Sequence, residues 1–357
     1  MADDQLILKV AGTEFRGWER IEVNRGLDAL CGAYQVSLTD SWSGHPDRWQ
    51  IEAGSPCEVW IGDDLVGTGY APRGRYKDTG TKRTIELEIR DKTQDLVDCS
   101  AVRDPGSWRG RKLEQIASDL ARPFGIKVTA VASTGEAFAK FAIEQGETVF
   151  SAIQRMCQAR GVLPITTAAG DVQIINPGST RAGYALTLGV NLEEIEFDND
   201  ISERFSDYIV KGYAGHKDRG GGQHPKATAQ DLGVTRYRPL LIVHDDQATS
   251  AVVDKRARWE ASVRSARSQK VTVTLPGWRE PATGELYTFD RVVHVLADRD
   301  GVDADLLIGS VRYFIDGKKG RRTEARLMPT AAYSLEPVQA GKGKSRRGKG
   351  VAPLTKS

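Results

Sequence analysis

The stretch Arg83-Thr-Ile-Glu-Leu-Glu-Ile-Arg90 carries the clearest fold signal in this chain. Its apolar residues Ile85, Leu87 and Ile89 alternate with charged ones. A period of two residues is typical of a half-buried antiparallel strand, with one face on a core and the other in water. Because similar short runs separated by Gly- and Asp-rich turns precede this stretch, we predict a β-barrel or sandwich over residues 1–100.

The pattern changes after this region. Apolar residues recur at helical spacing in two segments, 113–120 and 149–156, and short strand-like runs lie at 126–129 and 172–175. Pro123 and Gly125 follow the first helical segment, where a helix is expected to end. These features predict a small α/β domain over residues 101–189.

Strand patterns return from about residue 190 and run to about residue 332. One long helix is expected among them, over about 247–266, because this segment contains neither glycine nor proline. The residues expected along its inward stripe are Ala248, Ala251, Val252, Lys255, Trp259, Ser262, Val263 and Ala266. The Gly-rich segment 215–233 is expected to be a long loop.

A weak internal repeat relates the two β regions. Leu65-Val-Gly-Thr68, Arg75-Tyr76 and Lys82-Arg83-Thr84 are followed, at offsets of 242, 237 and 239 residues, by Leu307-Ile-Gly-Ser310, Arg312-Tyr313 and Arg321-Arg322-Thr323. The repeat predicts two similar β-domains in one chain. The alternative is a coincidence between two hairpins with similar turn chemistry.

Composition narrows the class of protein. Of 357 residues, 39% are hydrophobic and 37 are glycine, which is a globular composition that excludes wholesale disorder. No apolar run approaches the about 20 residues that a membrane-spanning helix needs, and no secretory signal is expected at the N-terminus. The four cysteines form no C-x-x-C pair, so we expect reduced and mostly buried thiols in a protein made in the cytoplasm.

Signals of catalysis are weak throughout the sequence. It holds no G-x-S-x-G, no H-E-x-x-H and no strand-linked G-x-G-x-x-G. His216 and His224 lie in the Gly-rich segment without cysteine or carboxylate ligands that would complete a zinc site. Glu193 and Glu194 are adjacent on an expected strand and should point to opposite faces. We therefore predict that the chain is not an enzyme and has no catalytic, cofactor or metal site.

The C-terminal segment has a charge opposite to that of the rest of the chain. Residues 340–357 hold six basic residues and no acidic one, and the remaining 44 basic and 48 acidic residues give the body a net charge of −4. The basic positions Lys342, Lys344, Arg346, Arg347 and Lys349 form a candidate polyanion-binding tail. The alternative is a disordered, solvated end without a binding role.

The order of several short motifs resembles the baseplate hub proteins of Mu-type contractile-tail phages, the family that includes late control protein D-like tail hubs. The motifs are Leu96-Val-Asp-Cys-Ser-Ala101, Pro123-Phe-Gly125, Gly146-Glu-Thr-Val-Phe150, Arg160-Gly161, Trp259 with Arg264-Ser-Ala266, Gly277-Trp278, and Leu306-Leu-Ile with Val311 and Leu327-Met-Pro329. Each motif is short, and their order and spacing together carry the resemblance. It covers residues 6–329 and not the tail.

The resemblance implies a mainly β fold with an α+β insert: two similar antiparallel β-barrels and a small α/β domain, assembling as a trimeric ring. It implies a first barrel over 1–100, an α/β domain over 101–189 joined by the helix 245–268, a second barrel over 190–244 and 269–332, and a basic tail over 333–357. It further implies a hub between a hexameric tail tube and a trimeric central spike. The implied partners are a homotrimer, the spike, the tube, other baseplate proteins, and DNA that passes through the channel without specific binding.

Three alternatives remain open from the sequence. The first is the hub of a related secretion or bacteriocin particle, which would share the fold. The second is a tail-associated peptidoglycan-degrading enzyme, which would need paired carboxylates in a cleft. The third is a nucleic-acid-binding protein that acts through the tail.

Overall fold

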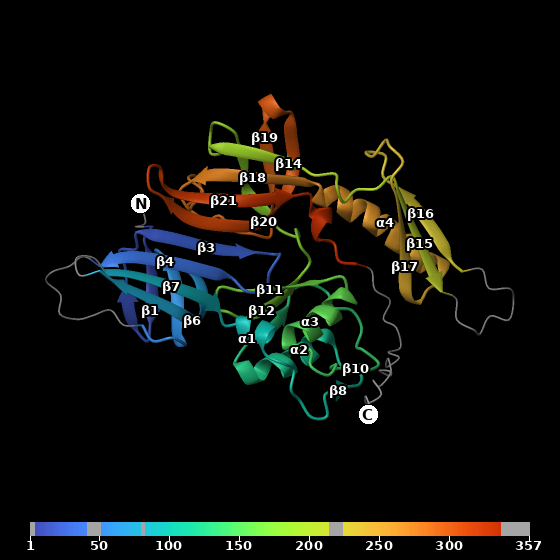
Figure 1. The fold of residues 1–357 in the computed structure, drawn as a ribbon, viewed down its shortest axis with the longest axis horizontal. Helices are drawn as coiled ribbons and strands as arrows, with labels where there is room; N and C mark the ends of the chain where they lie inside the picture. Colours follow the sequence, from blue (N-terminus) through green and yellow to red (C-terminus); the bar gives the residue numbers. More distant parts are fainter. Residues whose placement is uncertain (1–3, 41–50, 80–82, 214–223, 337–357) are drawn as a thin grey trace, which may run out of the picture.

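The computed structural model describes residues 4–40, 51–79, 83–213 and 224–336 (Figure 1). The basic tail positions 342–349 and His216 lie outside the described residues. Among those described, no helix is both long and apolar enough to cross a membrane.

Residues 4–91, which we call the first β-unit, form one curved antiparallel sheet. Its strands are β1 (Leu6–Val10), β2 (Thr13–Phe15), β3 (Arg20–Gly26), β4 (Ala33–Asp40), β5 (Ser55–Ile61), β6 (Asp64–Asp78) and β7 (Arg83–Asp91). They lie in the order β2-β1-β5-β6-β7-β4-β3. Ile85, Leu87 and Ile89 on β7 are buried, which confirms the strand predicted from their alternation.

The second β-unit, residues 181–199 and 269–333, repeats this arrangement. Its strands are β13 (Arg181–Thr187), β14 (Glu194–Asn199), β18 (Gln269–Pro276), β19 (Arg291–Ala297), β20 (Val302–Asp316) and β21 (Gly320–Met328), with short 3-10 helices at Asp298–Asp300 and Thr330–Tyr333. Their order, β13-β19-β20-β21-β18-β14, matches β1-β5-β6-β7-β4-β3 position for position across the sheet. The predicted pair of similar β-domains is therefore confirmed. One pairing differs from the antiparallel prediction, because β13 runs parallel to β19 whereas β1 runs antiparallel to β5.

Only part of the sequence repeat marks equivalent positions. Tyr76 pairs with Ile85 and Tyr313 pairs with Thr323, at matching places in the β6·β7 and β20·β21 hairpins. Leu65 instead lies at the start of β6 opposite Trp60, whereas Leu307 lies in the interior of β20. The offset of 242 therefore does not relate equivalent residues, because the two hairpins and their bulges differ in length.

The α/β unit, residues 93–176, lies to the right of the first β-unit and below the second in Figure 1. It contains α1 (Gln94–Asp98), β8 (Ser107–Trp108), α2 (Leu113–Ala121), a 3-10 turn (Arg122–Phe124), β9 (Val128–Ala130), β10 (Phe141–Ala142), α3 (Val149–Gln158), β11 (Leu163–Thr166) and β12 (Val172–Ile175). Both predicted helices are confirmed, with Leu113 and Ile116 of α2 and Ile153 of α3 fully buried in one core. Thr148 caps α3 by accepting a hydrogen bond from the Ser151 amide at 3.1 Å.

Residues 207–267 form a separate inserted unit that the sequence did not predict. It comprises β15 (Asp207–Tyr213), β16 (Lys226–Gln230), β17 (Pro239–Gln247) and α4 (Ser250–Arg267). The three strands make their own sheet, ordered β16-β15-β17, rather than joining the second barrel as expected for 190–244.

The long helix α4 belongs to this inserted unit and not to the α/β domain, to which the resemblance assigned it. Val252, Val253 and Ala257 of α4 pack on Val210 and the neighbouring strand residues of the small sheet. The predicted inward stripe is partly wrong, because Ala251 is exposed while Val253 and Ala257 are buried. Similarly, β13 pairs with β19 in the second β-unit although residues 181–187 were assigned to the α/β domain.

Candidate functional site

The seam between the two β-units is a continuous β-ladder. Strand β3 of the first unit pairs antiparallel with β20 of the second, from Ser310 opposite Gly26 to Phe314 opposite Glu22. The described strands β1–β7 and β13, β14 and β18–β21 thereby form one sheet with a single buried apolar core. A shared ladder and core hold the two units as one rigid body.

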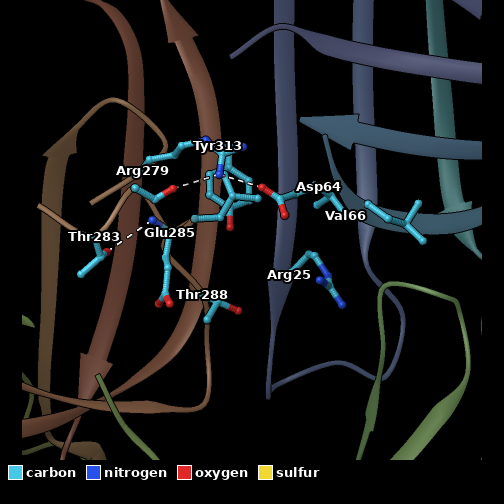
Figure 2. Close-up of a pocket in the computed structure, with 11 residues that line it drawn as sticks. Arg25, Asp64, Val66, Arg279, Thr283, Glu285, Thr288 and Tyr313 are labelled. Atoms are coloured by element: carbon cyan, nitrogen blue, oxygen red, sulfur yellow. Dashed lines mark hydrogen bonds and ion pairs between the residues drawn. The ribbon is translucent and has the colours of Figure 1, made fainter. Parts of the chain in front are cut away.

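Arg279 clamps the seam from the second unit. Its guanidinium donates to the Asp4 carboxylate at 2.6 Å and to the Ile61 carbonyl oxygen at 3.0 Å, and it lies 2.7 Å from an Asp64 oxygen. These three partners belong to the first unit, and Figure 2 shows Arg279 reaching toward Asp64. Since the Arg279 side chain is only 16% exposed, its bonds are partly shielded from water and stronger than those of a surface pair.

Replacing Arg279 with methionine should lower the free energy of unfolding by about 2 kcal/mol, because charge-assisted hydrogen bonds are lost while the apolar stem is kept. Urea unfolding followed by tryptophan fluorescence measures the change. Arg258→Met is the matched control, since Arg258 is mostly exposed and pairs only with Asp254 of its own helix among described residues. Equal effects of the two substitutions would contradict a clamp at the seam.

A cavity of about 330 Å³ opens beside this clamp (Figure 2). Both β-units line it, with Arg25, Asp64 and Val66 from the first and Glu285, Thr288 and Tyr313 from the second. Its lining contains no histidine, cysteine or serine, and the Asp64 carboxylate is bound to Arg279.

Arg25 enters the seam from β3. Its guanidinium donates to the Thr166 carbonyl oxygen of the α/β unit at 3.2 Å and lies over the Phe289 ring of the second β-unit at 5.2 Å. Nearby, the Tyr313 hydroxyl donates to the Tyr287 carbonyl oxygen. The Arg25 side chain thus contacts the α/β unit and the second β-unit as well as its own strand, so it joins three units at the seam.

A buried carboxylate, Asp91, lies where the first β-unit meets the α/β unit. Its oxygens accept hydrogen bonds from the Tyr34 hydroxyl at 2.6 Å and from the Gly32 amide at 2.8 Å. Burial raises the pKa of Asp91 to about 6, although the bonds from Tyr34 and Gly32 and the charge of Arg25 oppose this shift.

The raised pKa of Asp91 predicts a pH-dependent contribution to stability. The folded state binds this proton more tightly than the unfolded chain, whose aspartate pKa is about 3.9. The contribution is therefore fully present below about pH 4 and is lost as pH rises through about 6, by about 3 kcal/mol in all. Asp91→Asn should remove this slope, so the stability of the variant relative to wild type should increase between about pH 4 and pH 7. Urea unfolding across this range measures it, and a difference that is constant with pH would contradict the prediction.

The other candidate site residues are not brought together. His224 stacks on Tyr213 with ring centroids 5.8 Å apart. The ring nitrogens of His294, which was not a candidate from the sequence, lie 3.2 Å from Asp303 and 3.1 Å from Asp305. Glu193 binds Arg322 at 2.7 Å, away from any shared site with Glu194. In the part of the chain that the structure describes, no group of three or more His, Cys, Asp or Glu residues could hold a metal ion.

The cysteines are free, with Cys57 and Cys157 buried, Cys31 partly buried and Cys99 exposed. Sequence reasoning missed Arg279 and Arg25, whose partners are distant in the chain. It also missed Asp91, although a signal was available. Asp91 continues the buried alternation of residues 85, 87 and 89, and a charged residue at an inward position indicates a buried polar network.

Comparison with known proteins gives three family matches along the chain. Residues 5–91 match the N-terminal domain of Mu phage baseplate assembly protein GpP-like proteins, residues 93–176 the second domain of baseplate hub protein gp44-like proteins, and residues 249–336 the fourth domain of Mu phage baseplate assembly protein GpP.

Individual relatives agree with these matches over nearly the full length. Baseplate hub protein gp44 of Escherichia phage Mu is 34% identical over 352 residues, covering 96% of this chain and 91% of that protein. The 43 kDa tail protein of prophage MuSo2 from Shewanella oneidensis is 32% identical, with a TM-score of 0.83 over 93% of this chain and 99% of that one. A tail protein of Neisseria meningitidis MC58 is 25% identical, with a TM-score of 0.78 over 93% of this chain and 98% of that one. The chain therefore belongs to the baseplate hub proteins of Mu-type phage tails.

Proposed function

We propose that this hub protein works as a homotrimer that adapts a hexameric tail tube to a trimeric central spike. The observation that supports this most is the duplication, in which the two β-units have the same strand order within one chain. Three copies then present six similar β-units, a pseudo-six-fold surface, on an assembly whose true symmetry is three-fold. A six-fold tube ring can bind the pseudo-six-fold surface, and a three-fold spike can bind along the true three-fold axis.

The proposed partners follow from this geometry. They are two further copies of the chain, the central spike, the tail tube and other baseplate proteins, all assembled in the host cytoplasm into the baseplate of the virion. The channel would pass DNA without binding it specifically, because the body of the chain, with its net charge of −4, has no excess of cations to bind phosphates. The rigid seam supports such a role, since an adapter must keep the angle between its two β-units fixed.

Electron microscopy of the purified chain tests the proposal. Two-dimensional averages should show a ring with six lobes around a central hole and three-fold symmetry overall. Two lobes without a ring, the image of one chain, would contradict it. A cell-wall clearing assay separates the hub from the peptidoglycan-degrading alternative, for which clearing activity would be the sign.

The basic tail gives a further prediction. Deleting residues 341–357 should leave the assembly of the chain unchanged, because assembly would rest on the β-units. If the tail binds polyanions, the deletion should abolish retention of the chain on DNA at low salt, and the retention should fall steeply with salt in the full chain. Gel filtration and DNA-binding measurements on both forms check this. Equal DNA retention by both would contradict the tail as a binding segment.

A further inference from the structure

The seam within the chain joins two strands that each have an equivalent in the other β-unit. Strand β3 corresponds to β14, and β20 corresponds to β6, by their places in the two matching strand orders. Within one chain, β3 and β20 therefore pair with each other, whereas their equivalents, β14 and β6, do not. In the sheet order, β18, β21, β20, β3, β4 and β7 lie between β14 and β6, and the two do not pair within one chain (Figure 1).

Both separated strands have an unpaired edge among the described residues. Strand β14 ends the sheet and pairs only with β18. Strand β6 pairs with β5 only as far as Ala71, so its second half, residues 72–78, pairs on one side only, with β7. In the equivalent strand β20, the corresponding edge of the second half is paired with β3. An exposed edge strand is a template for pairing with another chain.

The repeated Arg-Tyr pair and the ladders together fix which residues are equivalent. Arg75-Tyr76 and Arg312-Tyr313 lie at matching places on β6 and β20, so Tyr76 is taken as equivalent to Tyr313. Tyr76 pairs with Ile85 and Tyr313 pairs with Thr323, so Ile89 and Leu327, four residues further along each strand, are equivalent. Ile89 pairs with Tyr34, which pairs with Val23, and Leu327 pairs with Val271, which pairs with Phe197. Val23 therefore corresponds to Phe197.

Applying the register of the seam to the separated strands gives a definite set of pairs. In the seam, Tyr313 lies opposite Val23, Arg312 opposite Asn24, and Phe314 opposite Glu22. The equivalent pairs place Tyr76 opposite Phe197, Arg75 opposite Asp198, and Lys77 opposite Glu196. The same register places Arg73, two residues before Arg75, opposite Asp200.

The side chains of these four pairs are chemically complementary. Three of the four join a basic residue of β6 to an acidic residue at or just beyond β14, and all six of these side chains are exposed. Among the described residues, Lys77, Glu196 and Asp198 have no ion-pair partner, and Arg75 lies 3.8 Å from Glu86. The fourth pair joins two aromatic side chains, Tyr76, which is 37% exposed, and the half-buried Phe197. Opposite charges and aromatic pairs directly across a ladder stabilise it.

We infer that β14 of one copy adds as an antiparallel strand to the second half of β6 of a second copy, in the register Arg75–Asp198 and Lys77–Glu196. The contact is head-to-tail, and three copies that repeat it about a three-fold axis would close a ring. It rests on the proposed homotrimer and names the surface that would hold it together.

Charge reversal on either edge tests the contact. Arg75→Glu with Lys77→Glu, or Glu196→Lys with Asp198→Lys, should each raise the dissociation constant of the trimer at least about 100-fold, because two attractive pairs become repulsive. Combining all four substitutions should restore the trimer, since the pairs are then attractive again. Arg109→Glu with Lys140→Glu is the matched control, an equal charge change at exposed positions of the α/β unit, and should have no effect. Light scattering across a dilution series measures the mass, and circular dichroism checks folding.

A disulfide tests the register independently. In a Cys99→Ser background, Arg75→Cys with Asp198→Cys should give covalently linked copies on a non-reducing gel, because opposed Cα atoms about 4.5–5.5 Å apart suit a disulfide. Arg75→Cys with Phe197→Cys is the control, because a shift of one residue places the second cysteine on the other face of the sheet. Covalently linked copies of the Arg75→Cys, Asp198→Cys variant, and none of the control variant, support the inference.

The possible outcomes distinguish the strand contact from the proposed function. A wild-type chain that is monomeric at every concentration would overturn both. A wild-type trimer that survives both charge reversals, and that forms no disulfide between positions 75 and 198 in the double-cysteine variant, would keep the trimer and overturn the strand contact. Loss of the trimer in each double variant with recovery in the combined one supports both.

Discussion

Replacing Trp278 with alanine should lower the free energy of unfolding by about 3–5 kcal/mol, the cost expected for a large buried aromatic side chain. Trp278 has no exposed surface, and its indole nitrogen donates to the Phe314 carbonyl oxygen of β20 at 3.2 Å. Its ring meets Tyr313 edge-on, with centroids 6.5 Å apart. Since Phe314 and Tyr313 both belong to the seam ladder, the substitution leaves a cavity directly behind it.

A second variant separates packing from hydrogen bonding at this position. Trp278→Phe keeps most of the apolar volume and loses the bond to Phe314, so its cost should be about 1–2 kcal/mol. Urea unfolding at fixed chain concentration measures both variants, because assembly would otherwise change the apparent stability. A cost below about 1 kcal/mol for Trp278→Ala would contradict the assignment of Trp278 to the core of the seam.

Gly69→Ala should be comparably damaging for a different reason. A Cβ atom at Gly69 would lie 1.8 Å from the Arg90 carbonyl oxygen, which belongs to the backbone of β7 and cannot rotate away. The position lies opposite Asp91, beside the bulge of the β6·β7 ladder. The ladder must therefore shift next to a buried carboxylate, at an expected cost of about 3 kcal/mol or more.

The matched control for this prediction is Gly183→Ala. Gly183 lies on β13 and an added Cβ would meet nothing within 4 Å. Its effect should be within about 1 kcal/mol of zero and can be stabilising, because alanine reduces the entropy of the unfolded chain. Thermal and urea unfolding of both variants check the pair. Similar stabilities for the two alanine variants would contradict the close approach of β6 and β7 at Gly69.

Local patterns in the sequence predicted much of the fold. The alternation at residues 85–89 and the helical spacing in α2 and α3 reflect burial of one face, which a short window of sequence records directly. Arg75-Tyr76 and Arg312-Tyr313 indicated the duplication because both pairs occupy the same place on their long strands. The resemblance to Mu-type hubs, which rested on the order of motifs, agrees with the relative that matches across 96% of the chain.

Local sequence patterns did not reveal which distant strands pair with each other. The insertion of β15, β16, β17 and α4 between β14 and β18 could not be distinguished from a second barrel, because its strands show no local pattern that sets them apart. The seam was missed for the same reason, since β3 and β20 meet across almost the whole chain. Arg279 likewise depends on Asp4 and Ile61, residues that only the folded chain brings near it.

The solution mass of the purified chain, measured by light scattering after gel filtration, decides whether the hub is a trimer. We predict three copies of the 39.1 kDa chain, about 117 kDa. The trimer should persist at about 0.5 M salt, because the paired backbone and the aromatic pair of the inferred contact are not screened as surface charges are. A chain that remains at 39.1 kDa at all concentrations and salt levels would contradict the trimeric hub.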